Sequence, residues 1–519
     1  MTVSAVYTLL SILGILFFAQ VAKIIYRIFL HPLARFPGPK LAAASSLYST
    51  YYNLVKGGQY TEMLPCLHDL YGPIVRTHPN ELHIRDIAAY NTIFKMGTPF
   101  SKDRQFYGFP FEGSHFSMTN TKSAKGRRDL LQPHLSHKAV KEIQPLLERS
   151  LGRFLEILER ARDNGESVDL SLGYRCVTID MLLGYAFGQS RKALNSADFD
   201  FPPAKYMDDV LFGSLLVKHF PGSLKLIFGV VLYLPRLITK KLVISSMIDM
   251  KESCCGMLLE LIDKRKHHKQ SHSTMFDTAI DQVISESPKA PTIQDLTAEA
   301  LVLLFAGGEA TAISLIKGTF HMLKDGNEFQ KLKNELHSAM PDPQTQITIE
   351  ELGRLPYLRG LVKESLRFTQ GAPGRLPRIV PDGGVTLCGE FIPAKTIVSS
   401  SHYVYHFDPH VFKDPMQFRP ERWLKDEDRE QLEKQLLSFS RGSRACIGIN
   451  LAYAELYLVF AHVFRRFNFR LDGTTDDEME LRDYYAPMAK GHLKVIPTTS
   501  AAVGETEESW KPNIEFAAN

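Results

Sequence analysis

The residues best suited to chemistry lie near the carboxyl end of the chain, around Cys446. The segment from Phe439 to Gly448 reads FSRGSRACIG, and an apolar pattern with helical period begins at Ile449. A thiol at a helix N-terminus is favoured as thiolate, because free N–H groups and the helix dipole stabilise the charge. Gly442 and Gly448 permit a tight backbone path. A thiolate is a metal ligand, so the segment predicts a metal-binding loop, although a lone Cys-x-Gly is more often structural.

A second segment with unusual residues is a long apolar helix expected upstream. Thr292 and Asp295 form a capping box, and the apolar run from Leu296 continues to Leu323, before a stop at Gly326. Its middle reads AGGEAT over residues 306–311. Two glycines in a helix interior each cost about 1 kcal/mol relative to alanine, and a buried carboxylate is costly without a partner. Such costs are typical of functional sites, but a buried helix with a kink explains them equally well.

These segments, taken together with two others, resemble the cytochrome P-450 family. Residues 439–448 match its haem-binding signature FxxGxRxCxG at every fixed position, residues 364–367 (ESLR) match its ExxR helix, and residues 420–423 (PERW) match its PER segment. The motifs occur in the order of the family, and the resemblance runs from Phe36 to about Pro497. It implies a mainly α fold with small β-sheets, in which haem b lies between the long helix and the cysteine loop.

The resemblance also implies roles for individual residues. Cys446 would ligate the haem iron, with Phe439 shielding its sulfur and Gly442 and Gly448 allowing close approach of the macrocycle. The residues expected to bind the haem propionates are Arg128, Arg378 and Arg444. A surface salt bridge is the alternative for Arg128 and Arg378. Glu364, Arg367 and Arg422 would form a buried charge network that holds the haem-binding core, whereas an isolated ExxR pair is usually a surface contact.

The same resemblance assigns the oxygen-binding groove to the middle of the long helix. Ala306 and Gly307 would leave room for dioxygen, and Glu309 would deliver protons. The family usually has threonine directly after this acid, but here Ala310 stands there and Thr311 follows. We therefore expect Glu309 with an ordered water to be the main proton donor and Thr311 to support it. Ala124 stands where the family tends to have a Trp or His propionate donor.

The amino-terminal segment predicts a membrane anchor. Residues 3–22 contain no charged residue, and about twenty such residues span a bilayer core. Lys23 and Arg27 follow, which places the remaining chain in the cytosol. A cleaved signal peptide would have its basic residues before the apolar stretch. We expect an anchor over 1–27, a linker with a Pro-Gly-Pro hinge over 28–40, a haem-binding monooxygenase domain over 41–497 and a polar tail over 498–519.

Two further segments are expected to meet the substrate. Residues 106–118 (FYGFPFEGSHFSM) are aromatic and glycine-rich and fall where the family has a variable loop over its pocket. Residues 211–234 are mostly apolar and fall where the family's substrate channel meets the membrane. Both could equally be ordinary core. The net charge of +4 is spread without long single-sign runs, which excludes a nucleic-acid-binding surface.

The function implied is insertion of one oxygen atom from dioxygen into a lipophilic small molecule, such as a terpenoid, a polyketide or a similar fungal biosynthetic intermediate. The sequence contains no dinucleotide fingerprint, so we expect electrons from NADPH through a separate NADPH-cytochrome reductase in the endoplasmic reticulum membrane. Two alternatives stay open. One is a haem-thiolate enzyme that rearranges an oxidised substrate without dioxygen, and the other is a non-enzymatic haem-binding protein.

Overall fold

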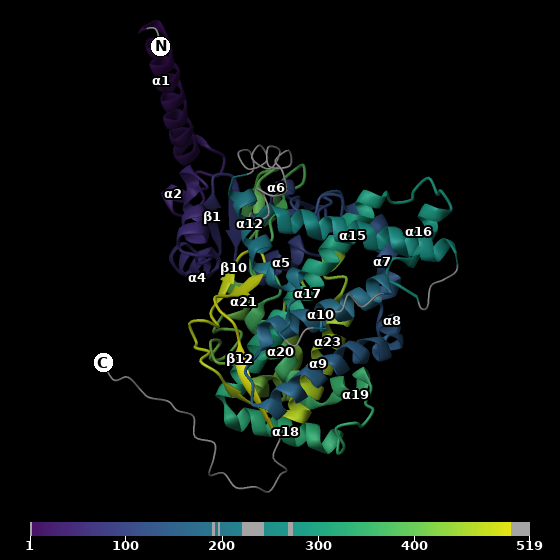
Figure 1. Cartoon of the computed structure of the whole chain (residues 1–519). Helices are drawn as coiled ribbons and strands as arrows, with labels where there is room; N and C mark the ends of the chain where they lie inside the picture. Colours follow the sequence, from purple (N-terminus) through teal and green to yellow (C-terminus); the bar gives the residue numbers. More distant parts are fainter. Residues whose placement is uncertain (1–2, 189–192, 196–197, 221–242, 268–272, 500–519) are drawn as a thin grey trace.

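The computed structural model describes residues 3–188, 193–195, 198–220, 243–267 and 273–499 (Figure 1). Helices dominate, and the strands form small sheets. The helices and helical turns are α1 Val3–Ile25, η1 Tyr26–Leu30, α2 Lys40–Ala44, α3 Leu47–Thr50, η2 Tyr51–Val55, α4 Tyr60–Tyr71, α5 Ile87–Ile93, α6 Arg104–Tyr107, α7 Thr121–Leu131, η3 Gln132–Leu135, α8 His137–Glu142, α9 Gln144–Asn164, α10 Leu170–Phe187, α11 Pro202–Lys205, α12 Met207–His219, α15 Val243–Lys266, α16 Asp277–Ile284, α17 Ile293–Lys324, α18 Gly326–Ala339, α19 Ile349–Arg354, α20 Pro356–Thr369, α21 Tyr403–His406, η4 Pro420–Trp423, α22 Asp426–Gln435, η5 Gly442–Arg444 and α23 Ile449–Arg466. The strands are β1 Ile74–His78, β2 Glu81–Ile84, β3 Ser101–Lys102, β4 Val168–Asp169, β5 Arg378–Ile379, β6 Val385–Leu387, β7 Glu390–Ile392, β8 Ile397–Ser399, β9 Phe467–Leu471, β10 Leu481–Asp483, β11 Pro487–Ala489 and β12 Lys494–Thr499.

The long helix expected from the sequence is α17, which runs through the centre of the body (Figure 1). Its capping box is present: the Asp295 amide donates to the Thr292 hydroxyl at 3.1 Å, and the Thr292 amide donates to the Asp295 carboxylate at 3.0 Å. Nearly every side chain of α17 is buried, against α10, α15, α20 and α23. The helix therefore forms the axis of the apolar core, because an all-round apolar helix must be covered on every side.

The largest sheet lies beside the helical core and has the strand order β1-β2-β8-β5-β3. Strand β2 pairs in parallel with β8, and the other pairs are antiparallel. Strands β1 and β2 are buried along their whole length, so neither shows the alternation of a half-exposed strand. This sheet brings Lys102 at the end of β3 next to Arg378 at the start of β5.

The amino-terminal helix α1 projects away from the body (Figure 1). The segment Tyr7–Leu30 has a mean hydropathy of 2.1 and is uncovered by the rest of the chain, as a membrane-spanning helix would be. Helical structure continues through η1 to Leu30, so the linker is shorter than expected and begins after that residue. At the hinge, a Cβ on Gly38 would lie 2.4 Å from the Arg76 carbonyl oxygen, so only glycine fits there.

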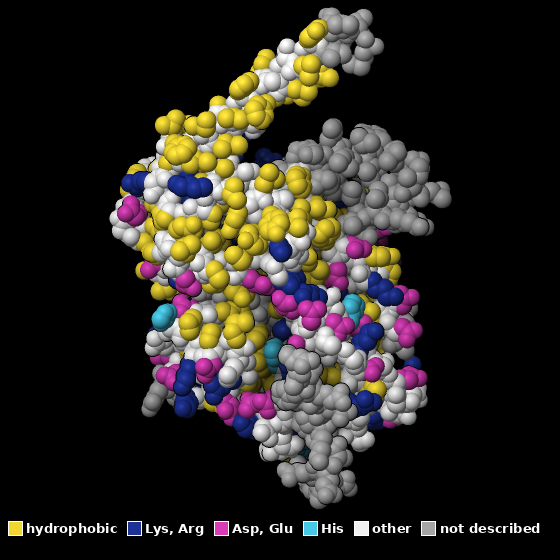
Figure 2. All heavy atoms as spheres, turned by 90° about the vertical axis from the view of Figure 1, so that its left-hand side faces the viewer, with side chains coloured by type: hydrophobic (Ala, Val, Ile, Leu, Met, Phe, Trp, Pro, Cys, Tyr) yellow, Lys and Arg dark blue, Asp and Glu magenta, His cyan; other side chains and the backbone are white. Residues whose placement is uncertain are grey.

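The surface next to α1 is strongly apolar. Figure 2 shows hydrophobic side chains gathered over the end of the body from which α1 emerges, whereas charged side chains dominate away from it. The exposed apolar residues near the start of the body include Phe29, Leu30, Leu41, Leu47 and Val55. Strand β12 extends to Thr499, two residues into the expected tail, and residues 500–519 lie outside the described part of the chain.

Candidate functional site

The cysteine loop is built by backbone geometry that requires glycine at one position. The Cys446 amide donates to the Phe439 carbonyl at 2.8 Å and closes the loop. Gly442 has a φ of +70°, and a Cβ there would lie 2.0 Å from the Phe94 carbonyl oxygen. Gly448 is the N-cap of α23, as expected, but no protein atom lies within 4 Å of its Cβ position. Of these two glycines of the cysteine loop, only Gly442 is therefore required by the surrounding protein atoms.

The thiol of Cys446 is enclosed by the fold, but its own surface is open on one side. Burial raises the pKa of this thiol, while the Gly448 amide, which donates to the sulfur, and the nearby Arg128 lower it. The helix N-terminus alone was expected to favour thiolate, and burial outweighs it in this structure. A metal ion bound to Cys446 would supply the missing positive charge, since a ligating thiol is deprotonated outright.

Four cationic side chains gather beside this loop. Burial lowers the pKa of Arg444 to about 10, with Arg378 and Arg128 adding repulsion. Burial also lowers the pKa of Lys102 well below its usual value, again with repulsion from Arg378, Arg444 and Arg128. Among the described residues, no carboxylate forms a salt bridge with any of the four.

This cation cluster fits the two propionates of a haem. Arg444 donates to carbonyl oxygens including those of His115 and Met118, at 3.0 and 2.8 Å, and Arg128 donates to the Ala445 carbonyl at 2.7 Å. Buried like charges without counter-charges are costly, so a dianionic group would relieve their repulsion. All three expected arginines are thus brought together. Lys102 was missed, because nothing in its own sequence segment distinguishes it from a surface lysine.

The middle of α17 has one accessible stripe. Ala306 is exposed, and its neighbour Gly307 and Ala310, one turn later, are partly exposed, within an otherwise buried stretch of the helix. The glycine pair also packs against α10. A Cβ on Gly308 would lie 2.8 Å from Ile179, and one on Gly307 would lie 3.1 Å from Leu182, both on α10. The glycines therefore let α10 and α17 approach closely, and the small residues of the open stripe are Gly307 and the two alanines.

Glu309 faces α10 and forms an ion pair with Arg175. Both hydrogen bonds between them measure 2.8 Å, and Arg175 also binds Asp208. Burial lowers the pKa of Arg175, but the two carboxylates outweigh it and raise the pKa, so the pair is ionic. The action of Glu309 with an ordered water stays a prediction, and the structure adds an arginine partner to this acid. Arg175 was missed because its position three turns before the end of α10 carries no motif.

Thr311 is directed toward α23. Its side chain hydrogen bonds to the carboxyl of Glu455, a fully buried residue nine positions after Cys446. Burial raises the pKa of Glu455 to about 8, and the Thr311 hydrogen bond opposes this rise. The other carboxyl oxygen has no hydrogen-bond partner among the described residues. Glu455 was also missed, although a carboxylate within the apolar run after Cys446 is the same kind of signal as Glu309.

The ExxR and PER residues form one buried network around Glu364. Its carboxylate accepts bonds of 2.8 and 3.0 Å from Arg367, 2.9 Å from Arg422 and 2.9 Å from the Trp423 indole. Arg367 also donates to the backbone carbonyls of His406 and Pro415. Glu364 and Arg367 are fully buried, so the alternative of a surface pair does not apply.

The expected substrate loop supplies an aromatic wall. Phe111 and Phe116 pack at 5.8 Å between ring centroids, and Phe111 packs on Phe305 of α17 at 5.5 Å. The ring of Tyr485, from the turn after β10, stacks on Phe111. Of the second expected segment, residues 211–219 lie in α12 and residues 221–234 lie outside the described part of the chain.

Comparison with known proteins agrees with this geometry. A family model described as "Cytochrome P450" matches residues 44–495. The "Cytochrome P450 monooxygenase sdnE" of Sordaria araneosa is 32% identical, over 95% of this chain and 98% of that protein. The "Tryptophan 6-hydroxylase fscE" of Fusarium equiseti is 33% identical, over 92% and 93%. The "Cytochrome P450 monooxygenase astB" of Aspergillus terreus is 34% identical, over 90% and 91%.

Proposed function

The chain belongs to the cytochrome P450 family, whose members bind haem through a cysteine thiolate, and we propose that this monooxygenase uses Cys446 to ligate the iron and oxidises a lipophilic biosynthetic intermediate. The observation that carries the proposal is the pairing of the thiol with the cation cluster. Cys446 offers the soft ligand, and Lys102, Arg128, Arg378 and Arg444 offer counter-charges for a dianion. A structural cysteine would need no such cluster beside it.

The protein residues divide the remaining work. The bound haem would activate dioxygen, with thiolate electron density favouring O–O cleavage. The short side chains of Ala306 and Ala310 leave room beside the accessible stripe of α17, so that small molecules would fit against it. Glu309 of α17, paired with Arg175, and Glu455 of α23, whose carboxyl pKa burial raises to about 8, are the two acids that would supply protons to the groove. Glu309 must exchange its bond with Arg175 before it can donate.

Partners and location follow from the same proposal. Electrons would come from NADPH through a separate reductase. Attachment to the cytosolic face of the endoplasmic reticulum is supported by the uncovered helix α1 and by the apolar surface around it (Figure 2). The substrate class stays open between terpenoid, polyketide and amino-acid-derived compounds. One relative, from Fusarium equiseti, is named for tryptophan, so aromatic acids belong among the candidates.

The test of the proposal is the ferrous carbon monoxide spectrum of Cys446→Ser. A serine hydroxyl is far less acidic than a thiol and is a poor soft donor, so the thiolate signature should disappear. Cys388→Ser is the matched control, since that partly buried thiol should leave the spectrum unchanged. A wild-type spectrum in Cys446→Ser would remove this residue from the site. Consumption of NADPH and incorporation of labelled dioxygen, with a reductase present, would then establish monooxygenation.

A further inference from the structure

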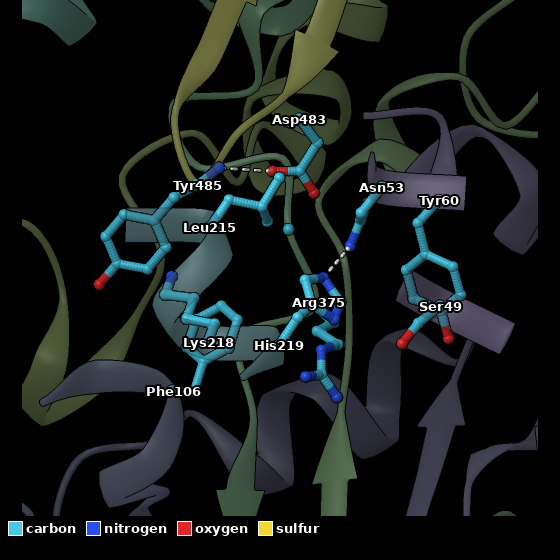
Figure 3. A pocket seen from close by; sticks show the side chains of 11 residues that line it. Ser49, Asn53, Tyr60, Phe106, Leu215, Lys218, His219, Arg375, Asp483 and Tyr485 are labelled. Carbon is cyan, nitrogen blue, oxygen red and sulfur yellow. Dashed lines mark hydrogen bonds between the residues drawn. The ribbon is translucent and has the colours of Figure 1, made fainter. Parts of the chain in front are cut away.

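A small pocket lies near the end of α12, outside the cysteine loop and the cation cluster (Figure 3). The α12 helix contributes one wall, and η2, α6 and the chain before β5 and after β10 contribute the others. The lining residues that matter for its chemistry are Asn53, Phe106, Lys218, Arg375, Asp483 and Tyr485. The pocket therefore combines aromatic rings with charged groups, which is unusual for a site that would admit only apolar compounds.

Lys218 is the cationic residue of this pocket whose charged group has no polar partner. Its Nζ atom is buried and makes no hydrogen bond within the described chain. It lies 4.0 Å from the ring centroid of Phe106 and beneath the ring of Tyr485 (Figure 3). Aromatic faces attract a cation, but they cannot accept the three N–H bonds that an ammonium donates. A buried ammonium in this state is costly unless an acceptor joins it.

Most other polar groups of the pocket have partners, and the exceptions among the described residues are Asn53 Oδ1 and the Tyr485 hydroxyl. Arg375 pairs with Glu81, and Asp483 accepts hydrogen bonds from the Thr61 hydroxyl and from the Tyr485 amide. The two ring nitrogens of His219 bond to Thr50 at 2.9 Å and to Asn53 at 3.0 Å. The Asp483 carboxylate is thus engaged by hydrogen bonds, although its charge still acts on Lys218 and opposes the fall in the pKa of that amine. Lys218 is the lining cation that has no hydrogen-bond partner within the described chain.

The aromatic rings of the pocket contact the aromatic wall beside α17. Tyr485 contacts Phe106 on the pocket side and Phe111 on the other, and Phe111 packs on Phe305 next to Ala306. Tyr485 also has a φ of +86°, a left-handed conformation that is strained for a tyrosine, and its buried hydroxyl has no described partner. This row of packed rings connects the Lys218 pocket with the part of α17 next to the accessible stripe.

We infer that Lys218 binds a carboxylate of the substrate, and that the substrate is an amphipathic acid with an apolar body and one anionic end. The inference rests on the proposed monooxygenase function and narrows its substrate class. Burial lowers the pKa of Lys218 well below its usual value. A carboxylate beside it would raise that pKa again, so binding of the acid should take up a proton.

The probes for this inference are two acids and their uncharged counterparts: dodecanoic acid with methyl dodecanoate, and 2-naphthoic acid with methyl 2-naphthoate. Affinities are measured by equilibrium dialysis on the full-length, haem-loaded protein in detergent. We expect each acid to bind about tenfold more tightly than its ester, since a hydrogen bond to a charged group contributes about 1.5–3 kcal/mol. Calorimetry in two buffers of different ionisation enthalpy should show proton uptake with the acids.

Lys218→Met should reduce the ratio of acid to ester affinity to about one and leave ester binding within about twofold. Lys218→Arg should retain the preference. Lys56→Met is the matched control, because Lys56 is exposed and does not line the pocket, and it should keep the wild-type ratio. Haem content reports whether each variant is folded.

Three results would overturn the inference: acids that bind no better than esters in the wild type, a preference that survives in Lys218→Met, or displacement of the acids by anionic phospholipid vesicles alone. The last would assign the cation to a lipid headgroup. Failure of the proposed function is read separately, since it would appear as loss of the thiolate signature in the carbon monoxide spectrum of the same preparation.

Discussion

Arg175 on α10 holds Glu309 on α17 through two hydrogen bonds of 2.8 Å, in a region where both side chains are almost fully buried. A charged pair of this kind keeps the acid out of the accessible stripe of α17. Asp208 shares the same arginine and is partly exposed, so it offers Arg175 an alternative partner. The buried acid is therefore linked through Arg175 to a partly exposed carboxylate.

The first prediction concerns this pair. Glu309→Gln should lower product formation by about 100-fold or more, since general acid groups typically contribute 10²–10⁴-fold. Thr311→Val should lower it less. The measured quantity is the amount of product formed per NADPH consumed, for a compound that shifts the ferric haem spectrum. Hydrogen peroxide is measured as well, because it forms when NADPH is consumed without product formation. Asp208→Asn is the control, because it preserves the ion pair between Arg175 and Glu309. Unchanged coupling in Glu309→Gln would exclude this acid as the donor.

The sequence was sufficient for the features that depend on local pattern. The capping box, the long apolar helix, the glycine at 442 and the grouping of Glu364, Arg367 and Arg422 all follow from spacing or from motif, and the structure contains each of them. The partners Arg175 and Lys102 were not predictable in this way, because their importance arises from tertiary contacts between segments that are distant in sequence and no local signal marks them. Glu455 does carry a local signal, a carboxylate within an apolar run, but its interaction with Thr311 is a tertiary contact.

The second prediction concerns the Glu364 network. Glu364→Ala leaves Arg367 and Arg422 buried without their common acceptor, which should cost about 3–5 kcal/mol of stability and prevent accumulation of haem-loaded protein. Glu421→Ala, in the same PER segment, is the control. Glu421 is half-exposed and pairs with Lys331 at the surface, so its loss should cost less than about 1 kcal/mol. Urea unfolding and haem content measure both. Equal effects in the two variants would contradict a structural role for Glu364.

The third prediction concerns membrane attachment. Deletion of residues 2–25 should release much of the protein from membranes, while haem binding survives because the body has its own core. The deletion keeps Arg27, whose guanidinium donates to the Ala44 carbonyl at 2.7 Å. Some attachment should persist through the apolar surface around Leu41 and Val55, and Leu41→Glu in the truncated protein should reduce vesicle binding by about tenfold.

Met96→Glu in the same truncated protein is the control for this surface. Met96 is equally exposed, but it lies beside the cysteine loop, where the neighbouring Gly97 amide donates to Ser443. It should leave vesicle binding unchanged. Loss of haem from the truncated protein would show instead that α1 is not separable from the body.

The last prediction concerns Glu455 and pH. Burial raises the pKa of its carboxyl to about 8, far above the value of about 4.3 for an exposed glutamate. The folded protein therefore holds this proton more tightly than the unfolded chain does. The stability that the protonated carboxyl contributes is fully present below the unfolded pKa and is lost as the pH rises toward about 8. Each pH unit in this window costs the wild type up to about 1.4 kcal/mol.

Glu455→Gln cannot ionise, so its stability relative to the wild type should increase steadily from about pH 5 to about pH 8 and become constant above that. Thr311→Val removes the hydrogen bond that opposes the rise in pKa, so its loss of stability should extend to higher pH than in the wild type. Urea unfolding of the haem-loaded proteins at several pH values measures both effects. A constant difference between Glu455→Gln and the wild type across this range would mean that Glu455 is already ionised at neutral pH, and it would remove this acid from the proton path next to Thr311.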